Sequence, residues 1–459
     1  MTNETIAAIA TPFGNSGIGI IRVSGDQAVA TVDRIFVNAK GEHILNSMES
    51  HTIRYGFLLN EDEILDEVMV SFFKGPKSFT AEDTVEINCH GGSFVLQKAL
   101  ELVIKNGARL ALPGEFTKRA FLNGRIDLSK AEAVMDVISS DSEIALKNSV
   151  SQLRGSIYHK IKEDRESIMH ETAYIESALD DPEHISFDDH KEEFISDVDK
   201  VIEDINKLLI SADNGRIIKD GIRTVIVGKP NAGKSSLLNL LSGSDRAIVT
   251  DVAGTTRDIL EEKVKLDDIT LCLTDTAGIR QTEDVVESIG VDKARKYMED
   301  ADLLLFVIDS SVPLDDNDRE IMGSLRERKS IVLYNKSDLE PVVKYEEISR
   351  MLSGVDIIKT SAVLNEGFEE LKNTVKKMFL SGDIDLNNEV MITNLRHKEA
   401  LITALNYLLN VKNSYESGIS EDFYTIDLLG AYSSLGSIIG EEVDDDLINT
   451  IFSKFCMGK

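Results

Sequence analysis

Cysteine is scarce in this 459-residue sequence, and its scarcity excludes two common ways of holding a fold together. The three cysteines, Cys89, Cys272 and Cys456, are too scattered for a disulfide framework or for the ligand spacing of a structural zinc site. So few thiols suit a reducing compartment. We therefore expect a cytoplasmic protein.

Targeting and membrane-spanning segments are also missing from the sequence pattern. Residues Met1 to Glu4 contain no basic stretch leading into an apolar core, as a secretory signal would. The longest strongly apolar run near the middle, Leu303 to Ile308, is far shorter than the roughly 20 residues that a spanning helix needs. We expect no membrane association.

Positive charge is in deficit, because 50 Lys and Arg face 80 Asp and Glu, for a formal net charge of −30. Such an acidic chain offers no broad basic surface for nucleic acid. If RNA is a substrate, we expect a local basic patch or a partner protein to supply much of the binding surface.

Length and composition predict several globular domains. At ~150 residues per domain the chain holds about three, and its 42% hydrophobic and 28% charged residues are ordinary for globular protein. Residues 1–118 alternate β-branched runs with helical patterns, which predicts an α+β domain. Its predicted strands are Ile6–Ile9, Ile18–Val23, Glu67–Phe73 and Thr84–Asn88, and its predicted helices are Ala28–Phe36 and Gly92–Lys105.

Two helical regions flank a third region of mixed pattern. Apolar residues recur at three- and four-residue spacing across 119–217 and again across 383–459. Residues 218–382 alternate strands with helices, which predicts a parallel sheet covered on both faces. Its predicted strands are Arg223–Val227, Thr270–Leu273, Leu303–Asp309, Ser330–Tyr334 and Asp356–Lys359. We therefore predict an all-helical domain into which an α/β domain is inserted.

Three other features allow both a structural and a functional interpretation. Gly17 and Gly19 resemble the start of a dinucleotide-binding loop, but Arg22 stands where its third glycine belongs, which favours turn residues. His90 beside two glycines is either a catalytic base or, as we favour, a structural residue at a strand-to-helix turn. The acid-rich stretch 188–199 is most simply a solvated helix face, since a metal cluster there has no supporting ligand spacing.

The most informative stretch is Gly-Lys-Pro-Asn-Ala-Gly-Lys-Ser at 228–235. It follows an apolar β-branched run and leads into a helical pattern, the context required of the phosphate-binding sequence G-x-x-x-x-G-K-[ST]. Gly228 and Gly233 let backbone N–H groups point at a polyphosphate, and the next helix adds its positive end. Lys234 can reach the β- and γ-phosphates, and Ser235 can bind Mg²⁺. Against the alternative of a chance glycine-rich turn, we predict a nucleoside triphosphate site.

The sequence Asn335-Lys336-Ser337-Asp338 predicts that the base is guanine. A carboxylate at Asp338 can accept the N1–H and N2 amino hydrogens of guanine. Adenine has no N1 donor, so it would lose a charged hydrogen bond worth roughly 1.5–3 kcal/mol. The Lys336 stem can lie over the base, Asn335 can join this loop to the phosphate loop, and Thr360-Ser361-Ala362 can add backbone contacts.

Two further segments fit the switch regions of a GTPase. In Asp275-Thr276-Ala277-Gly278, Asp275 fits a water-mediated Mg²⁺ partner and Gly278 a γ-phosphate sensor. In Gly254-Thr255-Thr256-Arg257-Asp258, a threonine fits the Mg²⁺ shell. Ile279 stands where Ras-like enzymes carry the glutamine that orients water, so another group orients it or hydrolysis waits for a partner. The charged candidates nearby are Arg257, Arg280, Glu283 and Glu287, and any of them is otherwise a solvated charge.

These segments, in this order and with the final Cys456-Met457-Gly458-Lys459, resemble the bacterial tRNA modification GTPases of the MnmE (TrmE) family over essentially the full length. The inserted GTPase domain and the terminal C-x-G-K are specific, because other P-loop GTPases share only the central part. The resemblance implies an α+β folate-binding and dimerisation domain at 1–118, an all-helical domain at 119–217 and 383–459, and a P-loop GTPase domain at 218–382.

The resemblance also implies site residues. GTP would be bound by Asn231, Ala232, Gly233, Lys234, Ser235, Ser236, Thr250, Asp251, Val252, Ala253, Gly254, Thr255, Thr256, Asp275, Thr276, Ala277, Gly278, Asn335, Lys336, Asp338, Ser361 and Ala362. Mg²⁺ would be bound by Ser235 and Thr256. K⁺ would be held by Asn231, Thr250, Val252 and Thr255, in the role of an arginine finger, with Glu287 orienting the water.

Family members use 5-formyl- or 5,10-methylene-tetrahydrofolate, and the matching folate residues are Arg22, Glu86, Arg125 and Lys459. Cys456 matches a residue associated with the modification chemistry, although sequence alone equally allows a packed thiol. Members form homodimers whose GTPase domains face each other, and assemble with the FAD-carrying flavoprotein MnmG into a heterotetramer. They add an aminomethyl or carboxymethylaminomethyl group to C5 of the tRNA wobble uridine. The alternative is a regulatory GTPase switch, of the ribosome-assembly type, without group transfer.

Overall fold

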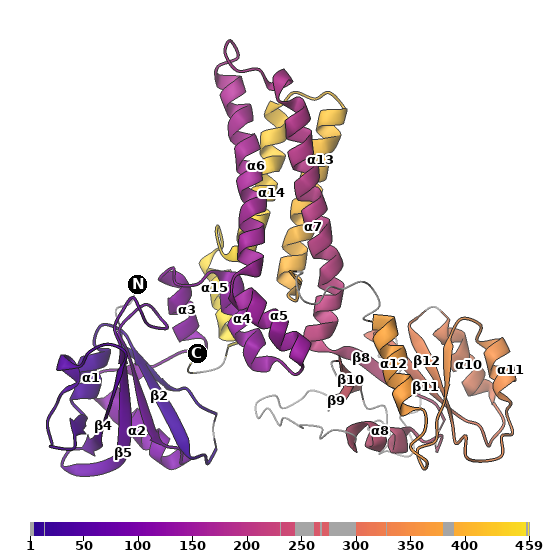
Figure 1. The fold of residues 1–459 in the computed structure, drawn as a ribbon, viewed down its shortest axis with the longest axis horizontal. Coiled ribbons are helices and arrows are strands. Elements are labelled where there is room, and N and C mark those ends of the chain that lie inside the picture. Colours follow the sequence, from indigo (N-terminus) through magenta and orange to yellow (C-terminus); the bar gives the residue numbers. More distant parts are fainter. Residues whose placement is uncertain are drawn as a thin grey trace, which may run out of the picture. The chain divides into compact units, whose positions relative to one another are not determined.

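The structure of the chain is a computed structural model with two compact units (Figure 1). It describes residues 4–12, 14–229, 231–243, 261–266, 269–274, 300–326, 328–379, 390–455 and 458. Unit 1 comprises Met1–Met135, Gln152–Val198 and Asn406–Lys459, and unit 2 comprises Asp136–Ser151 and Asp199–Leu405. Each unit contains one β-sheet with its own hydrophobic core.

Unit 1 begins with a seven-stranded sheet in the order β3-β4-β5-β6-β2-β1-β7, antiparallel except for the parallel pair β1 and β7. Along β2, Ile21 and Val23 are buried in the core that α2 covers, whereas Arg22 between them faces the other side. The bounds are β1 Ile6–Ile9, β2 Ile18–Ser24, α1 Ala28–Asp33, β3 Phe36–Asn38, η1 Leu45–Ser47, β4 Thr52–Asn60, β5 Glu63–Phe73, β6 Thr84–His90, α2 Ser93–Lys105 and β7 Arg109–Leu110.

The helical part of unit 1 is dominated by α6 and α14, which pack side by side (Figure 1). The guanidinium carbon of Arg165 on α6 lies 3.8 Å from the Tyr432 ring centroid on α14, and the same guanidinium pairs with Glu441. The bounds are α3 Glu115–Leu122, α6 Ser156–Asp180, η2 Phe187–Asp189, α14 Asp422–Ile439 and α15 Asp445–Ser453. Four of the described helices contribute residues to both units, namely α4 Leu128–Ser139, α5 Glu143–Leu153, α7 Lys191–Asp220 and α13 Leu395–Glu416.

Unit 2 contains a six-stranded sheet in the order β13-β12-β11-β8-β10-β9. Side chains of β11 alternate between two cores: Leu303, Leu305 and Val307 face α8 and α12, and Leu304, Phe306 and Ile308 face α10 and α11. Both faces of the sheet are therefore covered, as the continuous apolar run predicted. The bounds are α5 Glu143–Leu153, β8 Ile222–Val227, α8 Lys234–Gly243, β9 Glu261–Leu266, β10 Ile269–Thr274, β11 Leu303–Asp309, α10 Asp316–Leu325, β12 Ser330–Asn335, α11 Tyr345–Met351, β13 Asp356–Lys359 and α12 Phe368–Phe379.

The predicted parallel sheet gains an antiparallel edge that the sequence pattern did not indicate. Strands β13, β12, β11, β8 and β10 are parallel, and β9 pairs with β10 in the antiparallel sense. The domain boundaries at 118/119, 217/218 and 382/383 stay predictions. Among the described residues, no helix is both long and apolar enough to cross a bilayer.

His90 has a partner that the sequence did not reveal. It ends β6, and its Nδ1 lies 2.6 Å from Asp66 Oδ1. The hydrogen bond to this carboxylate raises the pKa of His90. Its side chain is exposed, in keeping with a residue that closes the end of a strand rather than one enclosed in a site.

A buried ion-pair cluster joins the end of the sheet to α3 and gives a pH-dependent prediction. Glu115 Oε1 lies 2.6 Å from Arg109 Nη2 and 3.1 Å from Arg119 Nη2. Burial alone would raise the pKa of Glu115, but the hydrogen bonds from Arg109, the Leu112 N–H and Arg119 outweigh it and lower the pKa from 4.5 to about 2. This carboxylate therefore stabilises the fold fully above about pH 4.5, and the stabilisation is lost as the pH falls toward 2.

We expect Glu115→Gln to lower the stability of unit 1 at pH 7 by on the order of 3 kcal/mol, because the buried Arg119 and the half-buried Arg109 lose a counter-charge. The difference from the wild type should shrink as the pH is lowered from 5 to 3. Urea-unfolding midpoints across this pH range measure it. Glu101→Gln, which breaks the exposed pair with Lys98 on α2, is the control and should change stability by about 0.5 kcal/mol or less. An equal loss in both variants at every pH would contradict the prediction.

Candidate nucleotide-binding site

The phosphate loop connects the carboxyl end of β8 to the first turn of α8, at the edge of the sheet where α/β folds bind ligands. Two of its residues must be glycine. Gly228 has φ +143°, and a Cβ there would lie 2.3 Å from the Val307 carbonyl oxygen. Gly233 has φ +102°, and a Cβ there would lie 2.1 Å from Asn335 Nδ2. The loop can thus lie directly against β11 and the residue that ends β12.

Lys234 holds its ammonium group inside this loop. Its Nζ donates to the carbonyl oxygens of Gly228 (2.5 Å) and Lys229 (2.6 Å). The positive charge therefore stands beside the N-terminus of α8, where both the ammonium and the positive end of the helix attract an anion. Ser235 and Ser236 are exposed in that turn, so their hydroxyls are open to a ligand or a hydrated ion.

Lys229 anchors the loop, a role that the sequence pattern did not indicate. Its Nζ lies 2.5 Å from Asp318 Oδ2 and 3.1 Å from Asp315 Oδ2, the two residues of the capping box that starts α10. Burial opposes the charge of Lys229, but these two carboxylates outweigh it and raise its pKa. Asn231, two positions along, is exposed and has φ +63°, a conformation that asparagine tolerates better than most residues.

Asn335 joins the phosphate loop to the base-recognition loops. Its Nδ2 donates to the Ala232 carbonyl (2.8 Å), and its Oδ1 accepts from Thr360 Oγ1 (3.2 Å). Asn335 is buried at the end of β12, so both bonds are shielded from water. Three segments far apart in the sequence are thereby held in one fixed arrangement.

The next residues present a carboxylate at the same edge. Ser361 Oγ donates to Asp338 Oδ1 (2.6 Å) and itself accepts from the Leu364 N–H (3.2 Å), so a buried hydroxyl orients the exposed Asp338. Lys336, with φ +59°, places its Nζ 2.6 Å from Asp309 Oδ2. Burial would raise the pKa of Asp309, but Lys336 and Ser311 outweigh it and lower it. Asp309 thus holds the Lys336 side chain in place. The sequence indicates this role only by placing a carboxylate at the end of an apolar strand.

A second group of predicted residues meets in unit 1, on the side of the sheet away from α2. Arg22 and Glu86 are cross-strand partners on β2 and β6, with Arg22 Nη2 2.8 Å from Glu86 Oε1. Arg22 Nη1 also donates to the Gly458 carbonyl (3.2 Å). The guanidinium carbons of Arg22 and Arg125 each lie 5.1 Å from the ring centroid of Phe79. Two guanidinium groups around one aromatic ring suit a flat ligand that carries a carboxylate.

Comparisons with known proteins identify the family of this chain. A family model described as "GTP-binding protein TrmE N-terminus" matches residues 5–125, and one described as "MnmE helical domain" matches residues 128–456. A "tRNA modification GTPase MnmE" of Lachnoclostridium phytofermentans is 54% identical over 100% of both chains. The chain belongs to the MnmE family of tRNA modification GTPases.

Two other MnmE proteins are similar to this chain over nearly its full length. Proteins of the same name from Thermoanaerobacter pseudethanolicus and Acetivibrio thermocellus are 47% and 46% identical over 100% and 99% of both chains. Among solved structures, the G domain of the T. maritima FeoB iron transporter is 28% identical over 35% of this chain and 99% of its own, with a TM-score of 0.27.

Membership in the MnmE family confirms the predicted activity and fold class. The chain is a GTPase of tRNA modification and binds GTP. The multidomain layout, with a P-loop GTPase domain, an all-helical domain and an α+β N-terminal domain, is likewise confirmed.

Many residues assigned from the MnmE resemblance lie outside the described residues. These are Thr250, Asp251, Val252, Ala253, Gly254, Thr255, Thr256, Asp275, Thr276, Ala277, Gly278, Glu287, Cys456 and Lys459. The described ones separate into two groups, the nucleotide residues of unit 2 and the Arg22, Glu86 and Arg125 group of unit 1.

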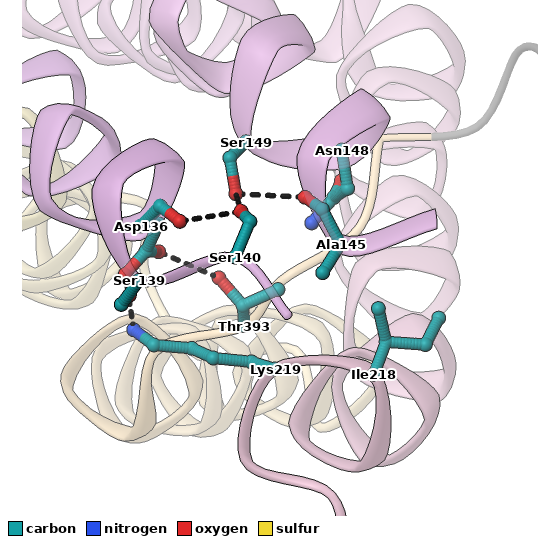
Figure 2. Close-up of a pocket in the computed structure, with 9 residues that line it drawn as sticks. All are labelled: Asp136, Ser139, Ser140, Ala145, Asn148, Ser149, Ile218, Lys219 and Thr393. Atoms are coloured by element: carbon teal, nitrogen blue, oxygen red, sulfur yellow. Dashed lines mark hydrogen bonds and ion pairs between the residues drawn. The ribbon is translucent and has the colours of Figure 1, made fainter. Parts of the chain in front are cut away.

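A small polar pocket in unit 2 is separate from the predicted nucleotide residues (Figure 2). Its lining residues are Asp136, Ser139, Ser140, Ala145, Asn148, Ser149, Ile218, Lys219 and Thr393. Asp136 is its centre, with Oδ1 2.8 Å from Lys219 Nζ and Oδ2 accepting from Thr393 Oγ1 (3.4 Å). Lys219 stands in the last turn of α7 and Thr393 lies just before α13, so Asp136 ties these two segments together.

Proposed function

We propose that this MnmE family member hydrolyses GTP in a potassium-stimulated reaction and, with a folate one-carbon donor and a flavoprotein, adds an aminomethyl or carboxymethylaminomethyl group to C5 of the tRNA wobble uridine. One observation carries the nucleotide part: Asn335 bonds the phosphate loop at Ala232 and the Thr360 segment at once, which joins phosphate recognition to guanine recognition. Membership in a family of tRNA modification GTPases supports the RNA part.

In this proposal, the nucleotide residues serve four functions. Lys234 and the loop N–H groups bind the phosphates, and Ser235 and Thr256 bind Mg²⁺. Asp275 contacts Mg²⁺ through a water molecule, and the Gly278 N–H senses the γ-phosphate. Asp338, Lys336 and the Ser361-Ala362 backbone bind guanine, supported by the hydrogen bond with which Ser361 orients Asp338.

Potassium takes the place of an arginine finger in this reaction, held by Asn231, Thr250, Val252 and Thr255. A cation beside the β- and γ-phosphates offsets the charge that develops in the transition state. The exposed position of Asn231 in the phosphate loop supports this role, because its side-chain oxygen is open to an ion. Glu287 orients the water in place of the glutamine missing at Ile279. Dimerisation of the GTPase domains completes the potassium site and couples hydrolysis to their approach.

GTP turnover should be about tenfold or more faster in K⁺ than in Na⁺ at equal ionic strength, because only the larger ion fits the ligand set. Asn231→Gly removes the side-chain ligand while keeping the left-handed backbone accessible, so it should abolish the difference. Asn365→Gly, at another exposed asparagine with positive φ (+56°), should keep it. The rate of phosphate release by the wild type and both variants, measured in K⁺ and in Na⁺, tests this prediction. Equal wild-type rates in K⁺ and Na⁺ would remove the potassium mechanism.

The one-carbon donor, 5-formyl- or 5,10-methylene-tetrahydrofolate, is proposed to bind at Arg22, Glu86, Arg125 and Lys459. The convergence of Arg22 and Arg125 on Phe79 supports this, since a pterin ring stacks on an aromatic face and a glutamate tail pairs with a guanidinium. Gly458, the residue before Lys459, is in contact with Arg22. Cys456 is proposed to act in the modification chemistry at the same end of the chain.

The proposed assembly rests on the MnmE family resemblance, and the charge of the chain supports one part of it. A chain with net charge −30 needs help to hold tRNA, so the MnmG-type partner, which carries FAD, supplies much of the RNA surface. The proposed complex is a heterotetramer around a homodimer of this chain, and it works in the cytoplasm.

Mass spectrometry of nucleosides from tRNA tests the function. Cells that lack the protein should lose C5-modified wobble uridines, and the wild-type gene should restore them. Lys234→Ala should fail to restore them, because the phosphate loop loses its ammonium group. Unchanged nucleosides in the deletion strain would instead favour the regulatory GTPase switch.

A further inference from the structure

The turn between α6 and α7 in unit 1 buries a carboxylate that is only partly satisfied. Glu171 of α6 is 1% exposed, and its Oε1 has no hydrogen-bond partner among the described residues. Burial raises the pKa of Glu171, and the neighbouring His190 offsets only part of this effect. A buried carboxylate oxygen without a donor is costly, so such a group usually marks a missing proton or cation.

Two imidazoles stand beside this carboxylate. His190, which follows η2 and caps it, is 7% exposed, and its Nε2 lies 2.9 Å from Glu171 Oε2. His170 precedes Glu171 on α6 and is exposed. One donor atom from each of His170, Glu171 and His190 lies within 4.8 Å of the others. The three side chains come from both sides of the turn. This explains why the acid-rich stretch 188–199 does not by itself contain residues at the spacing of metal ligands.

His190 is held in one orientation from two further directions. Its ring stacks on Tyr174, with centroids 3.9 Å apart and planes at 22°. Its Nδ1 lies 3.3 Å from Glu193 Oε2. If Nδ1–H donates to Glu193, Nε2 turns its lone pair toward Glu171, and two acceptors at 2.9 Å require a proton or a metal ion between them. A carboxylate on the outer nitrogen is the usual support of a metal-binding histidine.

We propose that His170, Glu171 and His190 bind a transition-metal ion of the zinc class, which clips α6 to the start of α7. A shared proton would join only Nε2 and Oε2, leaving Glu171 Oε1 unsatisfied and His170 unused. An ion uses all three side chains. Metal–ligand distances of about 2.0–2.2 Å separate neighbouring ligand atoms by roughly 3–3.5 Å, so the Nε2–Oε2 pair needs only a small widening. Two imidazoles and one carboxylate favour Zn²⁺ and its neighbours over Mg²⁺ or Ca²⁺.

Zinc binding to the full-length protein tests this site. The chain is stripped with a chelator, loaded with GDP and Mg²⁺, and titrated with Zn²⁺ against a chromogenic competitor. One Zn²⁺ per chain should bind with an affinity of about 1 µM or tighter. His170→Ala should weaken binding at least ~10-fold, and because His170 is exposed the variant should fold, as its circular dichroism and GDP affinity will show. Glu171→Gln should weaken it similarly.

Two controls separate this site from other zinc ligands. His184→Ala removes an exposed histidine of the same turn, which pairs with Asp181, and should leave the affinity unchanged. Cys456→Ser removes a thiol and should also leave it unchanged. Co²⁺ loading adds a spectroscopic readout, since the visible absorption of a histidine-bound Co²⁺ should vanish in His170→Ala. Absence of stoichiometric Zn²⁺, or binding by His170→Ala as tight as that by His184→Ala, would overturn the proposal in favour of a proton shared between Glu171 and His190.

Discussion

Replacing Asp338 with asparagine should change the preferred base of the nucleotide site from guanine to xanthine. The carboxylate that accepts the guanine N1–H and N2 amino hydrogens is lost, which should weaken GDP and GTP binding roughly 10- to 150-fold. Ser361 Oγ donates to Oδ1, and asparagine keeps that acceptor, so its amide Nδ2 takes the outer position. There it can donate to the xanthine O2, which stands where guanine has its amino group.

Affinities for fluorescent GDP and XDP measure this exchange. The matched control is Asp356→Asn, since Asp356 is exposed at the start of β13, the amino end of the parallel strand next to β12, whereas Asp338 follows the carboxyl end of β12. It should leave both affinities unchanged. Unaltered GDP binding by Asp338→Asn, without a gain for XDP, would place the base elsewhere.

The second large effect is expected for Gly233→Ala. The new methyl group would lie 2.1 Å from Asn335 Nδ2, at a backbone φ of +102° that an L-residue rarely adopts. Either the phosphate loop shifts or Asn335 leaves the Ala232 carbonyl, and each breaks the link between phosphate and base recognition. Strain and the lost hydrogen bond together should reduce GTP affinity on the order of 100-fold. Nucleotide titration and GTP turnover measure the loss.

Gly323→Ala is the control for this glycine. Gly323 lies inside α10 of the same unit, has no positive φ, and has open space where a Cβ would stand. Alanine there should keep nucleotide binding and stabilise the helix by roughly 0.5–1 kcal/mol. If Gly233→Ala bound GTP as well as Gly323→Ala does, the close approach of the loop to Asn335 would be unimportant.

The sequence predicted the elements whose residues show an unambiguous pattern. Strand β11 has its predicted bounds, Leu303–Asp309, because a buried parallel strand is apolar throughout. Strand β9 was missed because Glu261–Leu266 is mostly charged, which an edge strand with one exposed face tolerates. β4 was also missed, although Thr52–Asn60 contains one charged residue, Arg54, and pairs with a strand on each side.

The residues of the candidate site likewise fall into those that the sequence predicted and those that only the structure revealed. Spacing alone identified Lys234, Asn335 and Asp338, because phosphate and guanine chemistry fixes which residue must stand at each position. It did not identify the ion pairs of Lys229 with Asp315 and Asp318, which depend on where α10 starts relative to the phosphate loop. The cluster of His170, Glu171 and His190 was invisible for the same reason, since its members meet only when the chain turns back.

The hydrogen bond from Arg22 to the Gly458 carbonyl joins two residues that a ribosome makes at very different times. The two residues are 436 positions apart, so at 5–20 residues per second a ribosome needs roughly 20 to 90 s to make the second after the first. In the N-terminal sheet Arg22 can pair with Glu86 early, but its hydrogen bond to Gly458 must wait until residue 458 has been made. A chain cut short before residue 458 keeps Lys234, Asn335 and Asp338 but lacks the carbonyl that orients Arg22. The surroundings of Arg22 thus distinguish a chain that extends through residue 458 from one that stops after the GTPase region.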